Sequence, residues 1–481
     1  MNISIKKILS EYVPDILLTV LYLYCVKRIL YYYPTPQFSW DSFYYVKTGM
    51  EQEYGIRPSG YPYFLDWLYT LDPRVHLVVY TQYLIFWFSN LFLLKTLKSI
   101  FNIHPIVYIL LGVLLFTEPV ALYNSNAILS DLLFAALSTI SLACLLRYIH
   151  ANKLVYLLLH IVTVFACIEI RHIALFYPFF SCLVIFAYTK RKPINFAAIG
   201  LILLVFFALN RWHVSENEKR YGVPVYSAFS GWTHTNNALY SLPLIKIDPN
   251  TIEDPEIRKL HIFFTNYMDT SGFKSGVVGS GFLWDDKSPM NVLRLKLVDS
   301  LKLDYNSSWY RLAPGFAAYG KYLQMHFPKA YYETFIVPNT QTLLTPHIGE
   351  MADYLVTPYM DPLIMKHYHL KDENIRCNED IYKLKINKDI ETIYHYTTRW
   401  FLWCSLFLLI FAWRINFELF KPVSVLIAFP IVFCALTLYS SWFMYRYVMP
   451  LYPVMYSVII LTFHLLITEK VWKSKKMAAT T

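Results

Sequence analysis

The chain carries about ten apolar segments that are each long enough, at roughly 17–25 residues, to cross a lipid bilayer as a helix. The whole sequence is 56% hydrophobic and 16% charged, whereas a soluble domain is about half apolar and about a quarter charged. The pattern predicts an all-α polytopic membrane protein with about ten transmembrane helices. The segments are residues 12–32, 76–95, 104–123, 127–147, 154–170, 173–189, 195–211, 399–415, 420–440 and 446–467.

Basic residues in the short loops predict how these spans are oriented. The loop at 117–130 has no Lys or Arg, whereas the loops on the other side are basic. Positive loops face the cytoplasm, so both termini are predicted to be cytoplasmic, in the cytoplasmic (inner) membrane. The formal charge of +10 then belongs to cytoplasmic loops, and no nucleic-acid partner is expected. The basic clusters are Lys6/Lys7, Lys95/Lys98, Arg147/Lys153, Lys190/Arg191/Lys192, Arg414/Lys421 and Lys470/Lys473/Lys475/Lys476.

The span map divides the chain into three parts. Residues 1–211 form a module of seven spans, whose first external loop is 34–75. Residues 212–398 form a mainly helical extracytoplasmic subdomain, and residues 399–481 form a module of three spans with a basic cytoplasmic tail. Helical stretches are expected in the subdomain at Pro255–Tyr267 and Asn291–Leu303.

The first external loop concentrates chemistry-bearing residues. Ser39 can cap a helix, in which Asp41 and Tyr45 share one face. Gly55 can end that helix, and the turn Arg57-Pro58-Ser59-Gly60-Tyr61-Pro62 leads to a second short helix. An Asp in the first turn also stabilises a helix by itself, so Asp41 is either such a structural residue or a functional carboxylate.

Further charged residues are predicted on the same side of the membrane. Asp131 opens the fourth span, and it is either a second site carboxylate or a helix-terminal charge. Arg171 and His172 lie in the turn between the fifth and sixth spans, and Arg446 opens the last span. Such residues either bind an anion or reach the lipid headgroups. Glu118 is read as an interfacial charge.

With these motifs the chain resembles the GT-C superfamily of integral-membrane glycosyltransferases, in particular the branch of protein O-mannosyltransferases and lipid A aminoarabinose transferases. The resemblance covers the first seven spans and the last one. Ser59 is a small departure from the Arg-Pro-Pro-Gly-Tyr-Pro of many bacterial members. The motifs are Asp41 with Tyr45 and the Arg57–Pro62 turn, Asn124–Asp131, Arg171–Leu175 and Arg446–Pro450.

The resemblance implies an inverting glycosyltransferase. It would move a sugar from a polyprenyl-phosphate donor to an extracytoplasmic glycan, lipid or protein acceptor. Asp41 would act as the general base, with Asp131 as a second catalytic carboxylate. The arginines Arg171, Arg446 and Arg57, with His172, would stabilise the donor phosphate. Tyr45 and Tyr61 would contact substrate.

In the large loop, Trp232, Asn236 and Asn237 suit sugar stacking and hydrogen bonding, although fold-stabilising turns use the same residue types. His367 and His369 lack a third ligand at suitable spacing. No metal site or cofactor is therefore assigned, and a divalent cation on Asp41 and Asp131 stays open. The alternative functions are an envelope polysaccharide polymerase or ligase and, third, a transporter or flippase. The acidic first loop distinguishes the transferase from both.

Overall fold

The computed structural model describes residues 5–52, 55–189, 192–274, 278–345, 361–370, 386–415 and 417–478. Within these ranges the chain is helical and has no strand, which confirms the predicted all-α class. The longer helices, of at least eleven residues, are α1 (Ile5–Tyr32), α2 (Trp40–Glu51), α3 (Gly60–Leu71), α4 (Val75–Phe101), α5 (Pro105–Phe116), α7 (Ser130–Ala151), α8 (Leu154–Ile170), α9 (Tyr177–Tyr188), α10 (Pro193–Tyr221), α11 (Ala228–Leu239), α12 (Pro255–Ser271), α14 (Pro289–Leu301), α15 (Tyr305–His326), α20 (Ile386–Ile415), α21 (Phe417–Ser440) and α22 (Tyr452–Ala478).

Short helical elements connect these helices. Several begin with proline at the first helical position, where its missing N–H costs nothing. The short elements are α6 (Pro119–Asn124), α13 (Gly281–Trp284), α16 (Pro328–Tyr331), α17 (Val337–Leu344), α19 (Pro362–His367), the 3₁₀ segments His172–Phe176, Leu242–Leu244, Pro249–Thr251 and Tyr445–Leu451, and a π turn at Tyr332–Ile336.

Six helical segments of the described chain are long and apolar enough to cross a membrane. They identify a multi-pass membrane protein, and α5, α8 and the segment His172–Tyr188 are shorter apolar helices. The predicted first span lies in α1, which is not among the six, so the count of ten stays a prediction. The six are Val75–Phe101, Ser130–Ala151, Pro193–Tyr221, Thr392–Arg414, Phe417–Ser440 and Tyr445–Thr468.

Two predicted spans are not single helices. The segment 104–123 is broken into α5 and α6, because Thr117 and Glu118 leave the helix before Pro119. The last span begins as the 3₁₀ segment Tyr445–Leu451 before α22 starts. The second irregular stretch carries Arg446, a residue of the candidate site.

The described residues pack into two hydrophobic cores. The first lies among the helices of the bundle, from α1 to α9 and α20 to α22. The second is formed mainly by α11 to α15 and is rich in aromatic rings. We call residues 228–331 the aromatic subdomain. The predicted helical stretches at 255–267 and 291–303 correspond to α12 and α14.

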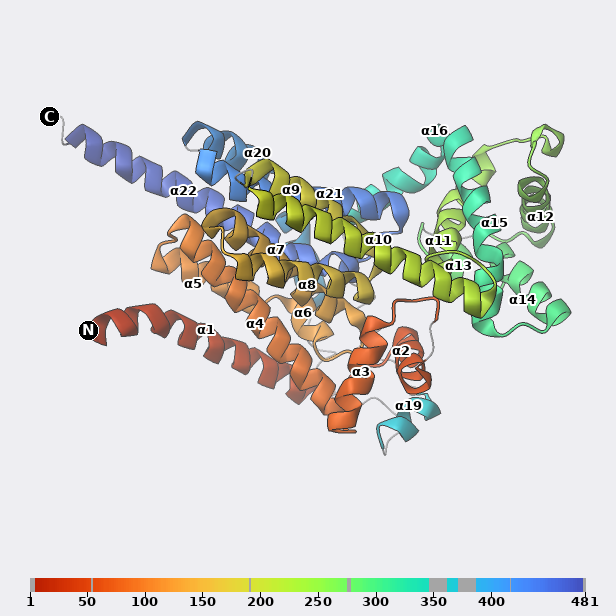
Figure 1. Cartoon of the computed structure of the whole chain (residues 1–481), viewed down its shortest axis with the longest axis horizontal. Helices are drawn as coiled ribbons and strands as arrows, with labels where there is room; N and C mark the ends of the chain where they lie inside the picture. Colours follow the sequence, from red (N-terminus) through yellow and green to blue (C-terminus); the bar gives the residue numbers. More distant parts are fainter. Residues whose placement is uncertain are drawn as a thin grey trace.

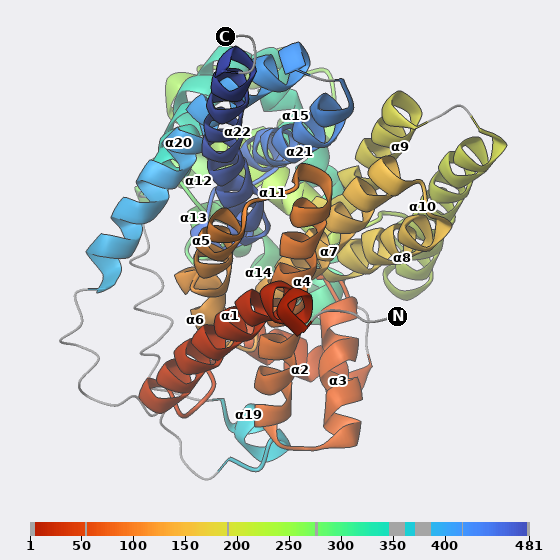
Figure 2. The same ribbon diagram turned by 90° about the vertical axis from the view of Figure 1, so that its left-hand side faces the viewer.

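The helices do not begin and end at the predicted limits of the middle part, residues 212–398. Residue 211 lies inside α10, which continues to Tyr221. A helix of 29 residues is about 44 Å long, longer than the roughly 30 Å hydrocarbon core. Its last turns therefore lead directly into the aromatic subdomain. Near the C-terminal end of the predicted middle part, Ile364 and Tyr368 belong to the bundle core, and α19 packs beside α2 (Figure 2).

The two chain ends and the aromatic subdomain lie at opposite ends of the molecule. Figure 1 shows the start of α1 and the end of α22 at the left, and α11 to α16 at the right. The predicted placement of both termini on the cytoplasmic side and of the large loop on the other stays a prediction.

Candidate active site

Helix α2 presents Asp41 in its first turn. Ser39 occupies the predicted N-cap position, and its backbone N–H donates to Ser42 Oγ (2.8 Å). The helix ends at Gln52 in a left-handed conformation, not at Gly55 as predicted. The positive end of the helix favours a carboxylate at Asp41. Since its side chain is 17% exposed, this carboxylate needs cationic partners.

Two arginines share the Asp41 carboxylate. Arg57 Nη2 donates to Oδ1 (2.7 Å), and Arg446 Nη2 donates to Oδ2 (3.0 Å). Burial by itself would raise the pKa of Asp41, but Arg57 and then Arg446 outweigh burial and lower the pKa to about 2. Asp41 is therefore ionised at neutral pH.

The turn that carries Arg57 is fixed by close packing. Tyr310 Oη donates to the carbonyl of Gly55 (3.2 Å). A side chain at Gly60 would place its Cβ 2.5 Å from the carbonyl oxygen of Glu169, at the end of α8. Only glycine allows α3 to start this close to α8. The turn thus lies beside the residues that follow α8, among which is Arg171.

A short bridge brings the start of α7 to the start of α2. Gln37 N–H donates to the carbonyl of Asn126 (2.9 Å), and Ile128 N–H donates to the carbonyl of Gln37 (2.9 Å). Tyr45 Oη and Ser130 Oγ then share a hydrogen bond of 3.0 Å. This pairing places Asp131, in the first turn of α7, near Asp41.

Asp131 is nearly fully buried and has two arginine partners. Arg171 Nη1 donates to Oδ1, and Arg446 Nη1 lies 3.7 Å from Oδ2. Tyr447 packs against both guanidinium groups, whose Cζ atoms lie 4.7 Å (Arg171) and 5.4 Å (Arg446) from its ring centroid. Arg446 therefore joins the two carboxylates.

The result is an alternating chain of charges in the order Arg57, Asp41, Arg446, Asp131, Arg171. We call these five residues the charged cluster. With three cations and two anions it has one excess positive charge. Its members are mutually paired and mostly buried, and the excess charge makes the cluster electropositive. Such a group can receive one further anion, such as a phosphate.

The structure thus brings together five of the charged residues predicted from the sequence, with Tyr45 beside them. Tyr61 lies behind Tyr45, with ring centroids 5.1 Å apart. It is fully buried, and its hydroxyl donates to Gln82 Oε1 (3.0 Å). It supports Tyr45 and has no surface for a ligand. His172 is not part of the cluster, since its ring packs edge-on against Tyr226 (5.1 Å).

The predicted substrate contacts in the large loop belong to the aromatic core. Trp232 is fully buried, stacks on Trp309 (3.9 Å) and donates to its carbonyl (3.0 Å). Asn236 Nδ2 donates to the carbonyl of Gly279 (2.9 Å), and Asn237 Nδ2 donates to that of Ser440 (3.1 Å). Substrate contact does not fit these placements, because a fully buried ring has no face left for a sugar.

Sequence reasoning missed aromatic residues from the subdomain that approach the cluster. The ring centroids of Phe229 and Trp284 lie 5.9 Å and 5.6 Å from the guanidinium carbon of Arg57, and those of Tyr44 and Tyr45 lie 5.6 Å and 5.7 Å from it. The contacts of Phe229 and Trp284 with Arg57 join positions more than 170 residues apart, and no local motif indicates them. The two acidic residues that follow Trp284 are the one local feature there, and the sequence does not show that the ring is exposed.

No group of three or more His, Cys, Asp or Glu that could hold a metal occurs among the residues that the structure describes. Asp41 and Asp131 are the two carboxylates that would hold a divalent cation, and each contacts two arginines. His367 of α19 stacks on Tyr69, with centroids 4.0 Å apart.

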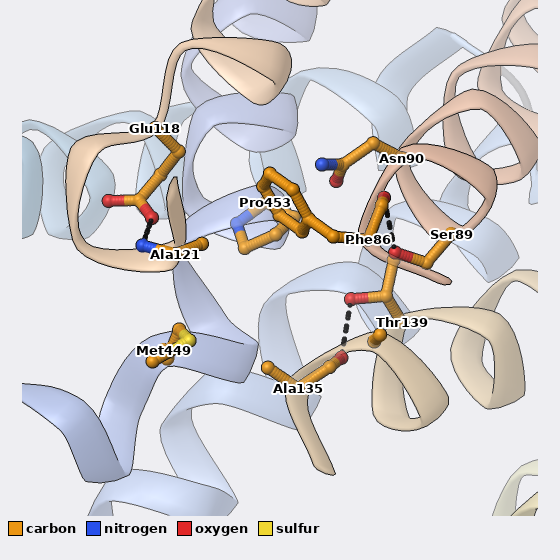
Figure 3. Close-up of a pocket in the computed structure, with 10 residues that line it drawn as sticks. Phe86, Ser89, Asn90, Glu118, Ala121, Ala135, Thr139, Met449 and Pro453 are labelled. Atoms are coloured by element: carbon orange, nitrogen blue, oxygen red, sulfur yellow. Dashed lines mark hydrogen bonds between the residues drawn. The ribbon is translucent and has the colours of Figure 1, made fainter. Parts of the chain in front are cut away.

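A small cavity lies deeper in the bundle and is separate from the charged cluster. It is about the size of one water molecule. Figure 3 shows Glu118 beside it, pointing to the backbone of Ala121. Glu118 is buried and not interfacial as predicted, because it caps α6 and accepts a hydrogen bond from Tyr394. None of the five charged-cluster residues lines this cavity.

No protein-family model and no curated protein sequence matches the chain. Among solved structures it is similar to the archaeal oligosaccharyltransferase AglB from Archaeoglobus fulgidus, in complex with an inhibitory peptide and a dolichol-phosphate. The identity is 11% and the TM-score is 0.43, over 98% of this chain and 52% of AglB. The chain thus spans about half the length of that protein.

Proposed function

We propose that the chain is a GT-C-type glycosyltransferase that moves a sugar from a polyprenyl-phosphate donor to an acceptor outside the cytoplasmic membrane. The observation that carries the proposal is the charged cluster, which combines a candidate base with an electropositive group. The sequence resemblance supports the same assignment, since its four motifs contribute all five residues of the cluster. The acceptor is a glycan, lipid or protein of the cell envelope.

The arginines and Asp41 of the charged cluster have different roles in this proposal. Arg171 and Arg446 bind the donor phosphate and stabilise the charge that it gains as it leaves. Asp41 accepts the proton of the acceptor hydroxyl. The acceptor oxygen forms a bond to the anomeric carbon while the bond from that carbon to the phosphate oxygen breaks. Attack opposite the leaving phosphate inverts the anomeric configuration.

Donor binding also makes Asp41 a stronger base. A carboxylate whose pKa is about 2 is a weak base at neutral pH. Arg446 is shared by Asp41 and Asp131, so a phosphate that attracts its guanidinium weakens its contact with Asp41. The pKa of Asp41 then rises toward a value that suits proton transfer. The proposal therefore predicts ordered action, in which donor binding precedes activation of the acceptor.

Mass spectrometry of envelope glycans, glycolipids and glycoproteins from a deletion strain tests the proposed function. Loss of one specific sugar, restored by the wild-type gene but not by Asp41→Asn, supports it. Loss of long polymer with intact repeat units would support the polymerase alternative instead. An unchanged envelope, or full restoration by Asp41→Asn, would contradict the proposal.

A further inference from the structure

The aromatic subdomain presents a ring surface directly beside the charged cluster. Trp284 and Tyr305 are 39% and 47% exposed, and Phe229 is half-buried between Trp284 and the core. The rings of Phe229 and Trp284 lie within 6 Å of the guanidinium carbon of Arg57. Arg57 in turn binds Asp41. The ring surface is therefore connected to the candidate base, Asp41, through Arg57.

This surface is rigid because a buried ring supports it from below. Trp309 is 1% exposed, and its ring centroid lies 5.5 Å from Trp284, 6.3 Å from Phe229 and 6.0 Å from Tyr305. Arg294, which is 9% exposed, lies 5.2 Å from the centroid of Tyr305. The rings are therefore held in place before any ligand arrives, which lowers the entropy cost of binding.

The chemistry around the rings favours a carbohydrate over a lipid. A sugar ring combines an apolar C–H face, which packs on an aromatic ring, with hydroxyl groups that need donors and acceptors. Arg57 and Asp41 supply these at one edge of the surface. Asp285 and Asp286 follow Trp284 and are exposed. Their negative charges oppose an anionic lipid headgroup but not a neutral sugar.

We propose that Phe229, Trp284 and Tyr305 form a sugar-binding subsite that holds a sugar ring of a carbohydrate acceptor beside Arg57 and Asp41. The acceptor role rests on the proposed function. The subsite replaces the contacts expected of Trp232, Asn236 and Asn237, which lie in the core beneath it.

The test measures sugar binding directly, by saturation-transfer NMR on the detergent-solubilised full-length protein. The probes are the methyl glycosides of glucose, galactose, mannose and N-acetylglucosamine. At least one probe receives saturation on its ring C–H protons from the wild-type protein. That signal falls about fivefold or more in Trp284→Ala and in Tyr305→Ala, and it is retained in Trp284→Phe, which keeps an aromatic face.

Tyr332→Ala is the matched control, because Tyr332 directly follows the aromatic subdomain in the chain and its ring is 58% exposed. It leaves the signal unchanged. The thermal midpoint of each variant checks that it is folded, and Tyr305→Ala still tests the surface if Trp284→Ala fails to fold. Saturation in Trp284→Ala and Tyr305→Ala that equals the wild-type signal, or no saturation of any probe, would overturn the subsite.

The outcome separates the subsite from the transferase activity. If the two substitutions leave saturation intact while Asp41→Asn abolishes sugar transfer, the subsite is wrong and the proposed function stands. If the envelope of the deletion strain is unchanged but sugar binding depends on Trp284, the subsite stands and the proposed function fails.

Discussion

Asp41 lies in the first turn of α2 and Glu118 caps the short helix α6, yet the two carboxylates have different kinds of partner. Glu118 accepts hydrogen bonds from its own helix, at Val120 N (3.3 Å) and Ala121 N (2.6 Å), and from Tyr394. Asp41 has two arginine partners, one of which comes from the last span. Hydrogen bonds within one helix cap stabilise the fold. Asp41 instead belongs to the charged cluster, whose residues come from distant segments and whose one excess positive charge suits a further anion. The predictions below test this difference.

The largest expected effect is on catalysis. Asp41→Asn keeps the shape of the side chain but removes the proton acceptor, so transfer falls by about 10²- to 10⁴-fold. Glu118→Gln, the matched control, changes transfer by less than about threefold, because Glu118 has no contact with the cluster. Turnover of lipid-linked sugar by both variants in proteoliposomes is the measurement. Comparable losses in the two variants would remove the distinction between them.

Arg171→Ala separates donor binding from acceptor binding. The substitution removes one of the cations proposed to bind the phosphate, so the KM for the donor rises about tenfold or more while the KM for the acceptor changes little. Arg147→Ala is the control, because Arg147 lies near the other end of α7 and donates to Thr96 and Tyr156. An unchanged donor titration in Arg171→Ala would contradict its role.

The acid stability of the protein reports on the pairing of Asp41. Its folded pKa of about 2 lies below the ordinary value of 3.8. The pairing therefore stabilises the fold above about pH 4, by about 2 kcal/mol, and this contribution is lost as the pH falls through about 2. The difference in thermal midpoint between the wild type and Asp41→Asn should be constant from pH 7 to pH 5. Below pH 4 the two midpoints should converge. Convergence already above pH 5 would show that Asp41 is not tightly paired.

The smallest effect is expected at a local cap. Glu118→Ala removes the acceptor for two backbone N–H groups and should lower the free energy of unfolding by about 1–2 kcal/mol. Asp254 caps α12 in the same way, by accepting from Glu256 N and Ile257 N, but it is exposed to water. Asp254→Ala should therefore lower the free energy of unfolding by less than Glu118→Ala does. Thermal unfolding in one detergent compares the two, and an equal or larger loss for Asp254→Ala would contradict the assignment.

The charged cluster was largely predictable from the sequence, because each member lies in a short motif at the end of an apolar segment. Placing these ends on one side of the membrane already brings Asp41, Asp131, Arg171 and Arg446 close together. What the sequence does not contain is the pairing order, which depends on the 3₁₀ start of the last span and on the bridge at Gln37.

The aromatic subdomain was less predictable. Its residues lie outside the apolar segments of the span map, so the sequence does not indicate which way they face, and an exposed and a buried tryptophan look alike. Trp232 is buried because α11 packs closely on α15, and a Cβ at Gly231 would lie 2.1 Å from the carbonyl oxygen of Ala313. This long-range contact, and not any local motif, decides that Trp232 is in the core and Trp284 at the surface.

Arg446 has a consequence for how the protein is made, since it lies 405 residues after Asp41 along the chain. While a ribosome is still synthesising the middle of the polypeptide, both aspartates are present without the guanidinium that links them. The cluster is completed when the final membrane segment enters the bilayer. Polypeptides truncated before that segment would retain under-compensated acidic groups at the membrane, which makes them candidates for removal by quality-control proteases.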